Sequence, residues 1–160
     1  MHFHAYLWSG DKALFDKESV RRPPPSAEPT ATSPAEVAAR YREAVAEWKT
    51  TGVPPIETAL WLVKPARMVR GTWKHPKEAA DWLRERLAEH APRFSSEQDK
   101  DPTRLAVLVA SAAEQLGRGG DVSHGFYLGQ PTFLSLALVT CSPNRAEPEL
   151  SCPLGQQVEV

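Results

Sequence analysis

Three histidines and one aspartate are the side chains of this sequence best suited to acid–base or metal chemistry. His2 and His4 are two positions apart in a segment where polar and apolar residues alternate, and Asp121 and His124 begin another such segment. Residues two apart on a strand project from the same face. Imidazoles held together can bind a divalent metal or exchange protons near neutral pH. We therefore predict either a metal site of His2, His4 and His124 or a catalytic group of His4, His124 and Asp121. The competing interpretation places these histidines on the polar face of an edge strand.

A second candidate is the basic segment at residues 64–77, which has five Lys and Arg side chains and no acidic ones. Arginine binds phosphate or carboxylate through two parallel hydrogen bonds, and an indole ring offers a surface for stacking. Arg67, Arg70 and Trp73 could thus hold an anionic ligand or a nucleic-acid strand. The alternative is a solvated connector whose basic side chains pair with acidic residues of neighbouring helices.

Five tryptophans form the third feature, and two of them suggest a protein partner. Trp82 lies one position off the apolar stripe of its helix and is close in sequence to Trp73. Partly exposed indoles are typical of protein contact surfaces, so this pair predicts a protein partner or self-association. The alternative is that both rings cover the flank of the core.

The two cysteines do not have the spacing of a metal knuckle or a redox pair, because Cys141 and Cys152 are eleven positions apart. We expect free thiols, with a disulfide that joins the tail to the last strand as the alternative. The glycine cluster at residues 117–120 follows a helix and is not a phosphate-binding loop. No residue set matches a known catalytic arrangement, so the leading hypothesis is a non-catalytic interaction or accessory protein. The alternatives are a small metal-binding protein or enzyme and a binder of anionic ligands.

The composition is that of a globular protein and gives no sign of a membrane-spanning or strongly nucleic-acid-binding one. The chain has 160 residues, 41% of them hydrophobic and 24% charged, which suits a single globular domain. A net charge of -1 gives no overall field to attract nucleic acid or an anionic membrane. No apolar run reaches the roughly 20 residues that span a bilayer, and the first residues do not form a secretion signal. For these two reasons we expect a cytoplasmic protein. The abundance of Ala, Arg and Pro, with few Lys, predicts a bacterial origin.

Periodicity predicts the elements that would position these side chains. Prolines that follow Ser33 and Asp101 indicate that these two residues cap the first and third helices. Residues at about 19–32 are rich in proline and are expected to form a flexible insert. The tail after about 142 should be irregular. The expected elements are a strand at 2–8, a helix from 33 to about 51, a buried strand at 58–63, helices at 76–91 and 101–117, and a hairpin of strands at 122–128 and 133–141.

Together these elements predict an α+β fold in which a small, mostly antiparallel sheet of about four strands carries about three helices on one face. The helix at 101–117 has the widest apolar stripe. We therefore expect it to be the most buried.

Overall fold

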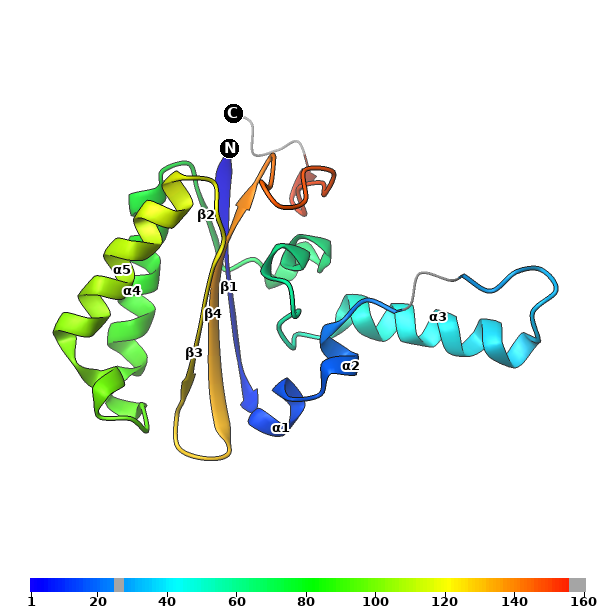
Figure 1. Ribbon diagram of the computed structural model, residues 1–160, viewed down its shortest axis with the longest axis horizontal. Coiled ribbons are helices and arrows are strands. Elements are labelled where there is room, and N and C mark those ends of the chain that lie inside the picture. Colours follow the sequence, from blue (N-terminus) through cyan, green and yellow to red (C-terminus); the bar gives the residue numbers. More distant parts are fainter. Residues whose placement is uncertain (25–27, 156–160) are drawn as a thin grey trace.

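A four-stranded antiparallel sheet with the order β2-β1-β4-β3 is the centre of the molecule (Figure 1). The computed structural model describes residues 1–24 and 28–155. The two central strands, β1 (His2–Asp11) and β4 (Thr132–Cys141), pair along their whole length, from His2 opposite Cys141 to Asp11 opposite Thr132. β2 (Gly71–Trp73) and β3 (Val122–Tyr127) form the edges. The predicted α+β class with a mostly antiparallel sheet is confirmed.

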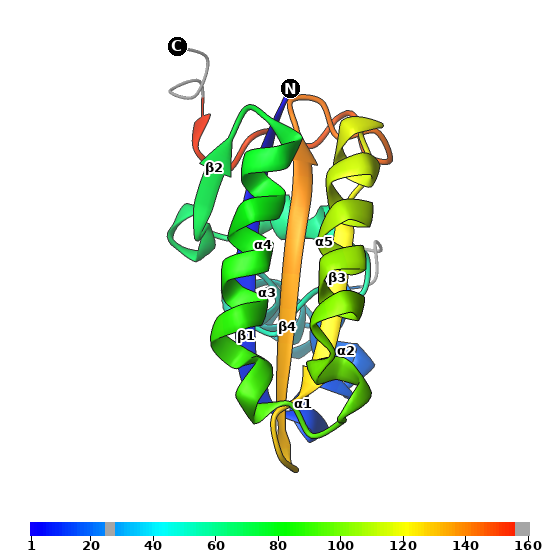
Figure 2. The ribbon, with the colours of Figure 1, turned by 90° about the vertical axis from the view of Figure 1, so that its left-hand side faces the viewer.

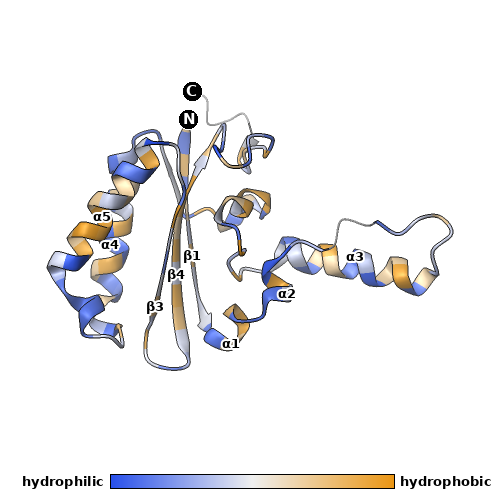
Figure 3. Ribbon diagram, in the orientation of Figure 1, coloured by the Kyte–Doolittle hydropathy of each residue, from blue (hydrophilic) through white to orange (hydrophobic). Residues whose placement is uncertain are grey.

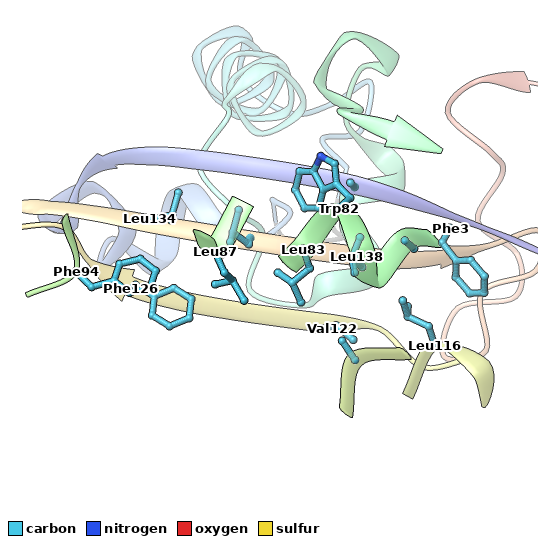
Figure 4. Close-up of a cluster of buried hydrophobic side chains, with 14 of the residues drawn as sticks. Phe3, Trp82, Leu83, Leu87, Phe94, Leu116, Val122, Phe126, Leu134 and Leu138 are labelled. Carbon is cyan, nitrogen blue, oxygen red and sulfur yellow. The ribbon is translucent and has the colours of Figure 1, made fainter. Parts of the chain in front are cut away.

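Two helices, α4 (Pro76–His90) and α5 (Pro102–Gly117), lie side by side over one face of the sheet (Figure 2). Hydrophobic and hydrophilic residues alternate along both of them, as expected for amphipathic helices (Figure 3). Alternate residues of β1, β3 and β4 point into the core beneath them (Figure 4). Its large buried side chains are Phe3, Trp82, Leu83, Leu87, Phe94, Leu116, Phe126, Leu134, Leu136 and Leu138.

The opposite face of the sheet is covered as well, so the central strands are buried on both sides. Here Tyr6 of β1 stacks on Trp61, with ring centroids 4.6 Å apart. Trp61 belongs to the short 3-10 helix η1 (Thr58–Val63), and Cys152 of the C-terminal segment packs against the same cluster. Burial on both faces explains why β4 has a near-continuous apolar sequence.

The prediction of a buried strand at 58–63 is wrong, because these residues form η1. The segment closes its own short turns, with hydrogen bonds from Leu60 N to Glu57 O and from Lys64 N to Trp61 O. Its burial does not alternate, since Ala59, Trp61 and Leu62 are all buried. The fourth strand is instead β2, which has three residues and was not predicted.

The helix α3 (Ala35–Thr50) extends away from the sheet on the side opposite α4 and α5 (Figure 1). Little of this helix is buried, because Trp48 is its one buried residue and Val37 is 48% exposed. The predicted cap is wrong: Ser33 Oγ accepts a hydrogen bond from Thr30 N, and Pro34 is the residue that precedes the helix.

The expectation that the third predicted helix is the most buried is also wrong. In α5 only Ala112 and Leu116 are buried, whereas α4 buries five residues. Part of the wide apolar stripe of α5 stays in solvent, since Val107 is 62% exposed. Its predicted start is confirmed: Asp101 Oδ1 accepts a hydrogen bond from Thr103 N, and Pro102 opens the first turn.

The Pro-rich segment begins inside a short helix. After α1 (Lys12–Phe15), helix α2 (Glu18–Arg21) occupies the first residues of the predicted insert at 19–32, and residues 25–27 lie outside the described residues. Arg21 Nε donates to Pro54 O at 2.9 Å, and its guanidinium lies 3.7 Å from the Phe15 ring centroid. This end of the segment is therefore attached to the body of the protein. Residues 143–154 contain bends and turns but no helix or strand.

Candidate metal centre

Strand alternation places His2 and His4 on the η1 side of the sheet, together with Tyr6. Phe3 and Ala5 point to the α4 and α5 side instead. Both histidines are buried, with 5% and 0% of their surfaces exposed. β1 is a central strand, so these side chains do not lie on the solvated face of an edge strand, as the competing interpretation held.

The sheet register brings a cysteine to these histidines. Cys141 is the last residue of β4 and lies directly opposite His2. Cys152 reaches the same place from the C-terminal segment, with Sγ 3.5 Å from His2 Nε2 and 3.4 Å from His4 Nε2. The two Nε2 atoms are 3.1 Å apart. One ligand atom from each of the four residues lies within 4.8 Å of all the others.

A neighbouring strand orients His4. Thr72 of β2 is paired with His4, and its Oγ1 lies 2.7 Å from His4 Nδ1. In the tautomer whose Nδ1–H donates to this hydroxyl, the lone pair of Nε2 points to the cluster. Burial, with a smaller contribution from His2, lowers the pKa of His4 to about 4. The imidazole is therefore neutral at physiological pH, the form that binds a metal.

At Cys141 burial opposes metal binding, because a thiol must lose its proton to become a ligand. Burial, together with the nearby Cys152, raises the pKa of Cys141 to about 11, although the Ser142 hydroxyl acts in the other direction. Without a cation this thiol stays protonated at neutral pH. A bound divalent ion would supply the positive charge that the thiolate needs.

A buried phenol lies on the same face beside the cluster. The Tyr6 hydroxyl has no hydrogen-bond partner among the described residues. Burial raises the pKa of Tyr6, and the charges of Cys141 and Cys152 raise it further. The site thus has a polar donor near its two sulfur atoms.

Asn144 fixes the path that leads Cys152 back to the sheet. This side chain is fully buried, and its Nδ2 donates to Thr140 O at 2.7 Å and to both carboxylate oxygens of Asp121. Its Oδ1 accepts hydrogen bonds from Ala146 N and Glu147 N. The C-terminal segment is therefore attached to the ends of β4 and β3 before it reaches the cluster.

The other predicted members of the histidine group lie elsewhere. His124 is on β3 between Val122 and Phe126, which both belong to the core beneath α4 and α5, so it is on the opposite face from His2 and His4. Asp121 accepts a hydrogen bond from Thr140 N at 2.8 Å in addition to those from Asn144. The structure thus brings together His2 and His4 and separates them from His124 and Asp121.

The basic segment 64–77 is divided by the fold. Lys64 is buried, with its ammonium hydrogen-bonded to Trp48 O and 3.6 Å from the Trp48 ring centroid. Arg67 and Arg70 line a hollow on the η1 side of the sheet. Trp73 packs against the core on the α4 side, so it does not join the two arginines.

The expected exposure of Trp82 is wrong. Trp82 is 8% exposed and belongs to the core of α4, while Trp73 is partly buried against it with ring centroids 6.2 Å apart. An α-helix places residues 79, 82, 83 and 87 on one broad face. The two indoles therefore cover the flank of the core, and the argument for a protein contact surface at this pair is lost.

The cysteines are the site residues that the sequence did not reveal. Both are free thiols, as expected, but they lie beside the two histidines. A local spacing rule cannot detect them, because the four ligands come from β1, the end of β4 and the C-terminal segment. A pairing of the first and last predicted strands would have been the signal, since it places Cys141 near His2.

In comparisons with protein families, curated proteins and solved structures, nothing matches this chain. Within residues 1–24 and 28–155, no helix combines the length and the apolar character needed to cross a bilayer.

Proposed function

We propose that this protein binds a zinc ion through His2, His4, Cys141 and Cys152. The observation that carries the proposal is the convergence of these four ligand atoms within 4.8 Å of one another. Two imidazole nitrogens and two thiolates in a tetrahedral arrangement are a set that zinc prefers.

The distances support a tetrahedral site. With usual zinc–ligand bond lengths, the edges of the tetrahedron are about 3.3 Å between two nitrogens and about 3.6 Å between nitrogen and sulfur. The cluster has 3.1 Å between its nitrogens, and 3.4 and 3.5 Å between the nitrogens and Cys152 Sγ. An ion could therefore enter with side-chain shifts of a few tenths of an ångström for these three ligands.

Charge balance favours a divalent ion in this buried place. Two thiolates and two neutral imidazoles carry a charge of about −2, which one zinc ion neutralises. The hydrogen bond of Thr72 to His4 is the kind of outer contact that orients a metal-binding imidazole.

Four protein ligands leave no open coordination position, which is typical of structural rather than catalytic zinc. The ion would join the start of β1, the end of β4 and the C-terminal segment. We infer that zinc stabilises the fold at the edge where the two ends of the described chain meet (Figure 1).

The test is metal analysis of the full chain purified under reducing conditions. We expect equimolar zinc, and absorption bands of tetrahedral thiolate-bound cobalt after replacement of zinc by Co²⁺. Cys152→Ser and His4→Ala should each lose the zinc and the bands. His124→Ala is the matched control and should retain both.

Zinc should also raise the unfolding temperature, because an ion that binds only the folded state stabilises it by about 4 kcal/mol at a thousand times its dissociation constant. A wild-type protein that retains no metal under these conditions, or a His124→Ala variant that loses it while Cys152→Ser does not, would refute the proposal.

A further inference from the structure

A hollow of about 410 Å³ lies on the η1 side of the sheet, apart from the four metal ligands. Its walls come from β1, from η1 and from the 3-10 helix η2 (Ala66–Met68) with the residues that follow it. The volume is within the range of small-molecule sites, about 300 to 1,000 Å³. It is the kind of concave surface that could hold a compact ligand.

The charge of this hollow is positive. Arg67 and Arg70 both line it, and none of the lining residues is acidic. Neither arginine forms a salt bridge with any residue of the described chain. Two guanidinium groups without carboxylate partners favour an anion, which each could bind through a pair of hydrogen bonds.

Apart from Ser9 and Gly52, the rest of the wall is aromatic or apolar. Trp8 is partly exposed and lies against Gly10, where an added Cβ would approach its Cζ2 to 2.5 Å. Glycine at this position therefore leaves room for the indole. Trp61, held by its stack on Tyr6, and Met68 complete the apolar lining. An indole face beside a guanidinium can stack on a planar ring of a ligand.

From this juxtaposition we propose that the hollow binds a small ligand that joins a planar aromatic ring to a phosphate or carboxylate group. The anionic group would pair with Arg67 and Arg70, and the ring would stack against Trp8. This site is independent of the metal centre.

A small ligand fits better than a nucleic-acid strand. A strand needs a continuous basic track with several stacking rings. The fold breaks the basic segment, because Lys64 is buried against Trp48 and Trp73 lies on the opposite face of the sheet. Of the basic residues of the segment, Arg67 and Arg70 are the two that line the hollow, and two arginines can hold one anionic group.

The test is isothermal titration of the full chain as purified with four probes: adenosine monophosphate, 4-hydroxybenzoate, adenosine and inorganic phosphate. We expect at least one of the two ring-bearing anions to bind at least about tenfold more tightly than adenosine or phosphate, because it engages both the arginines and the ring. A preference for the monophosphate would identify the phosphate class, and a preference for the benzoate would identify the carboxylate class.

Three variants locate the site. Arg67→Ala and Arg70→Ala should each weaken the preferred probe at least about tenfold, and Trp8→Leu should weaken it more than it weakens inorganic phosphate. Arg42→Ala on α3 is the matched control and should bind like the wild type. The unfolding temperature and the far-ultraviolet circular dichroism spectrum show that each variant is folded.

Two results would overturn the inference: no millimolar or tighter binding of either ring-bearing anion, or unchanged binding by the double variant Arg67→Glu with Arg70→Glu.

Discussion

The buried ammonium of Lys64 should make the protein more stable at alkaline pH. Lys64 is 2% exposed, and burial lowers its pKa from 10.5 to about 8. Its contacts are the carbonyl of Trp48, which accepts its hydrogen bond, and the ring of the same residue. No acidic partner forms a salt bridge with it among the described residues.

The direction of the effect follows from proton binding. Between pH 8 and pH 10.5 the folded state has lost the Lys64 proton while the unfolded state still binds it. The free energy of unfolding therefore rises with pH through this window. A pKa difference from 10.5 to about 8 corresponds to about 3 kcal/mol. This is an upper value, because the Trp48 ring favours the charged form.

The assay is urea denaturation at half-unit steps from pH 7 to pH 10.5, on the wild type and on Lys64→Met. Other groups, including Cys141 with its raised pKa, titrate in the same range in both proteins. The difference in unfolding free energy between the two proteins isolates Lys64. We expect wild type to gain up to about 3 kcal/mol relative to Lys64→Met as the pH rises.

Lys49→Met, on the exposed surface of α3, is the control and should show a constant difference from wild type. A difference between wild type and Lys64→Met that stays constant from pH 8 to pH 10.5 would refute the reasoning. It would show that the carbonyl and ring of Trp48 keep the ammonium charged.

Two further predictions concern residues whose roles the fold reveals. Trp82→Ala should lower the free energy of unfolding by about 3 to 5 kcal/mol in urea denaturation, since the indole is in the core beside Leu83; a loss below about 1 kcal/mol would mean that the ring is dispensable there. Asn144→Ala should weaken zinc binding about tenfold or more in a competition assay with a chromogenic chelator, because binding would then have to order the segment that carries Cys152. Unchanged affinity in a folded Asn144→Ala protein would show that this segment is fixed by other contacts.

Local sequence signals predicted the elements that cover one face of the sheet. Pro76 opens α4 and Asp101 caps α5. Both effects depend only on residues within the first turn of the helix, so they can be predicted from the local sequence. The hairpin of β3 and β4 was predicted because its apolar runs flank a short Gly-Gln-Pro turn. In contrast, β2 has only three residues, too few for a period, and its pairing with β1 is a long-range contact.

Alternation along β1 correctly placed His2 and His4 on one face, but the inclusion of His124 with them ignored the same rule on β3. Val122, His124 and Phe126 share one face, and two of these residues are strongly apolar. That face had to contact the helices. Applied consistently, the period of two would have separated His124 from the other histidines.

The cysteines could not be assigned from spacing because the metal site joins sequence-distant parts of the chain. A zinc knuckle takes its ligands from short local spacings, whereas here His2 and Cys152 are 150 positions apart. A link between distant residues stabilises the fold more than a link between near ones, because it restricts the unfolded chain more. This difference is small, since each doubling of loop length adds about 0.6 kcal/mol. The larger contribution is local, because the ion would hold residues 143–154, which contain turns but no helix or strand, against the buried face of β1 and β4. Zinc removal should therefore release this segment first, and amide hydrogen exchange around Cys152 should increase before exchange in β4 does.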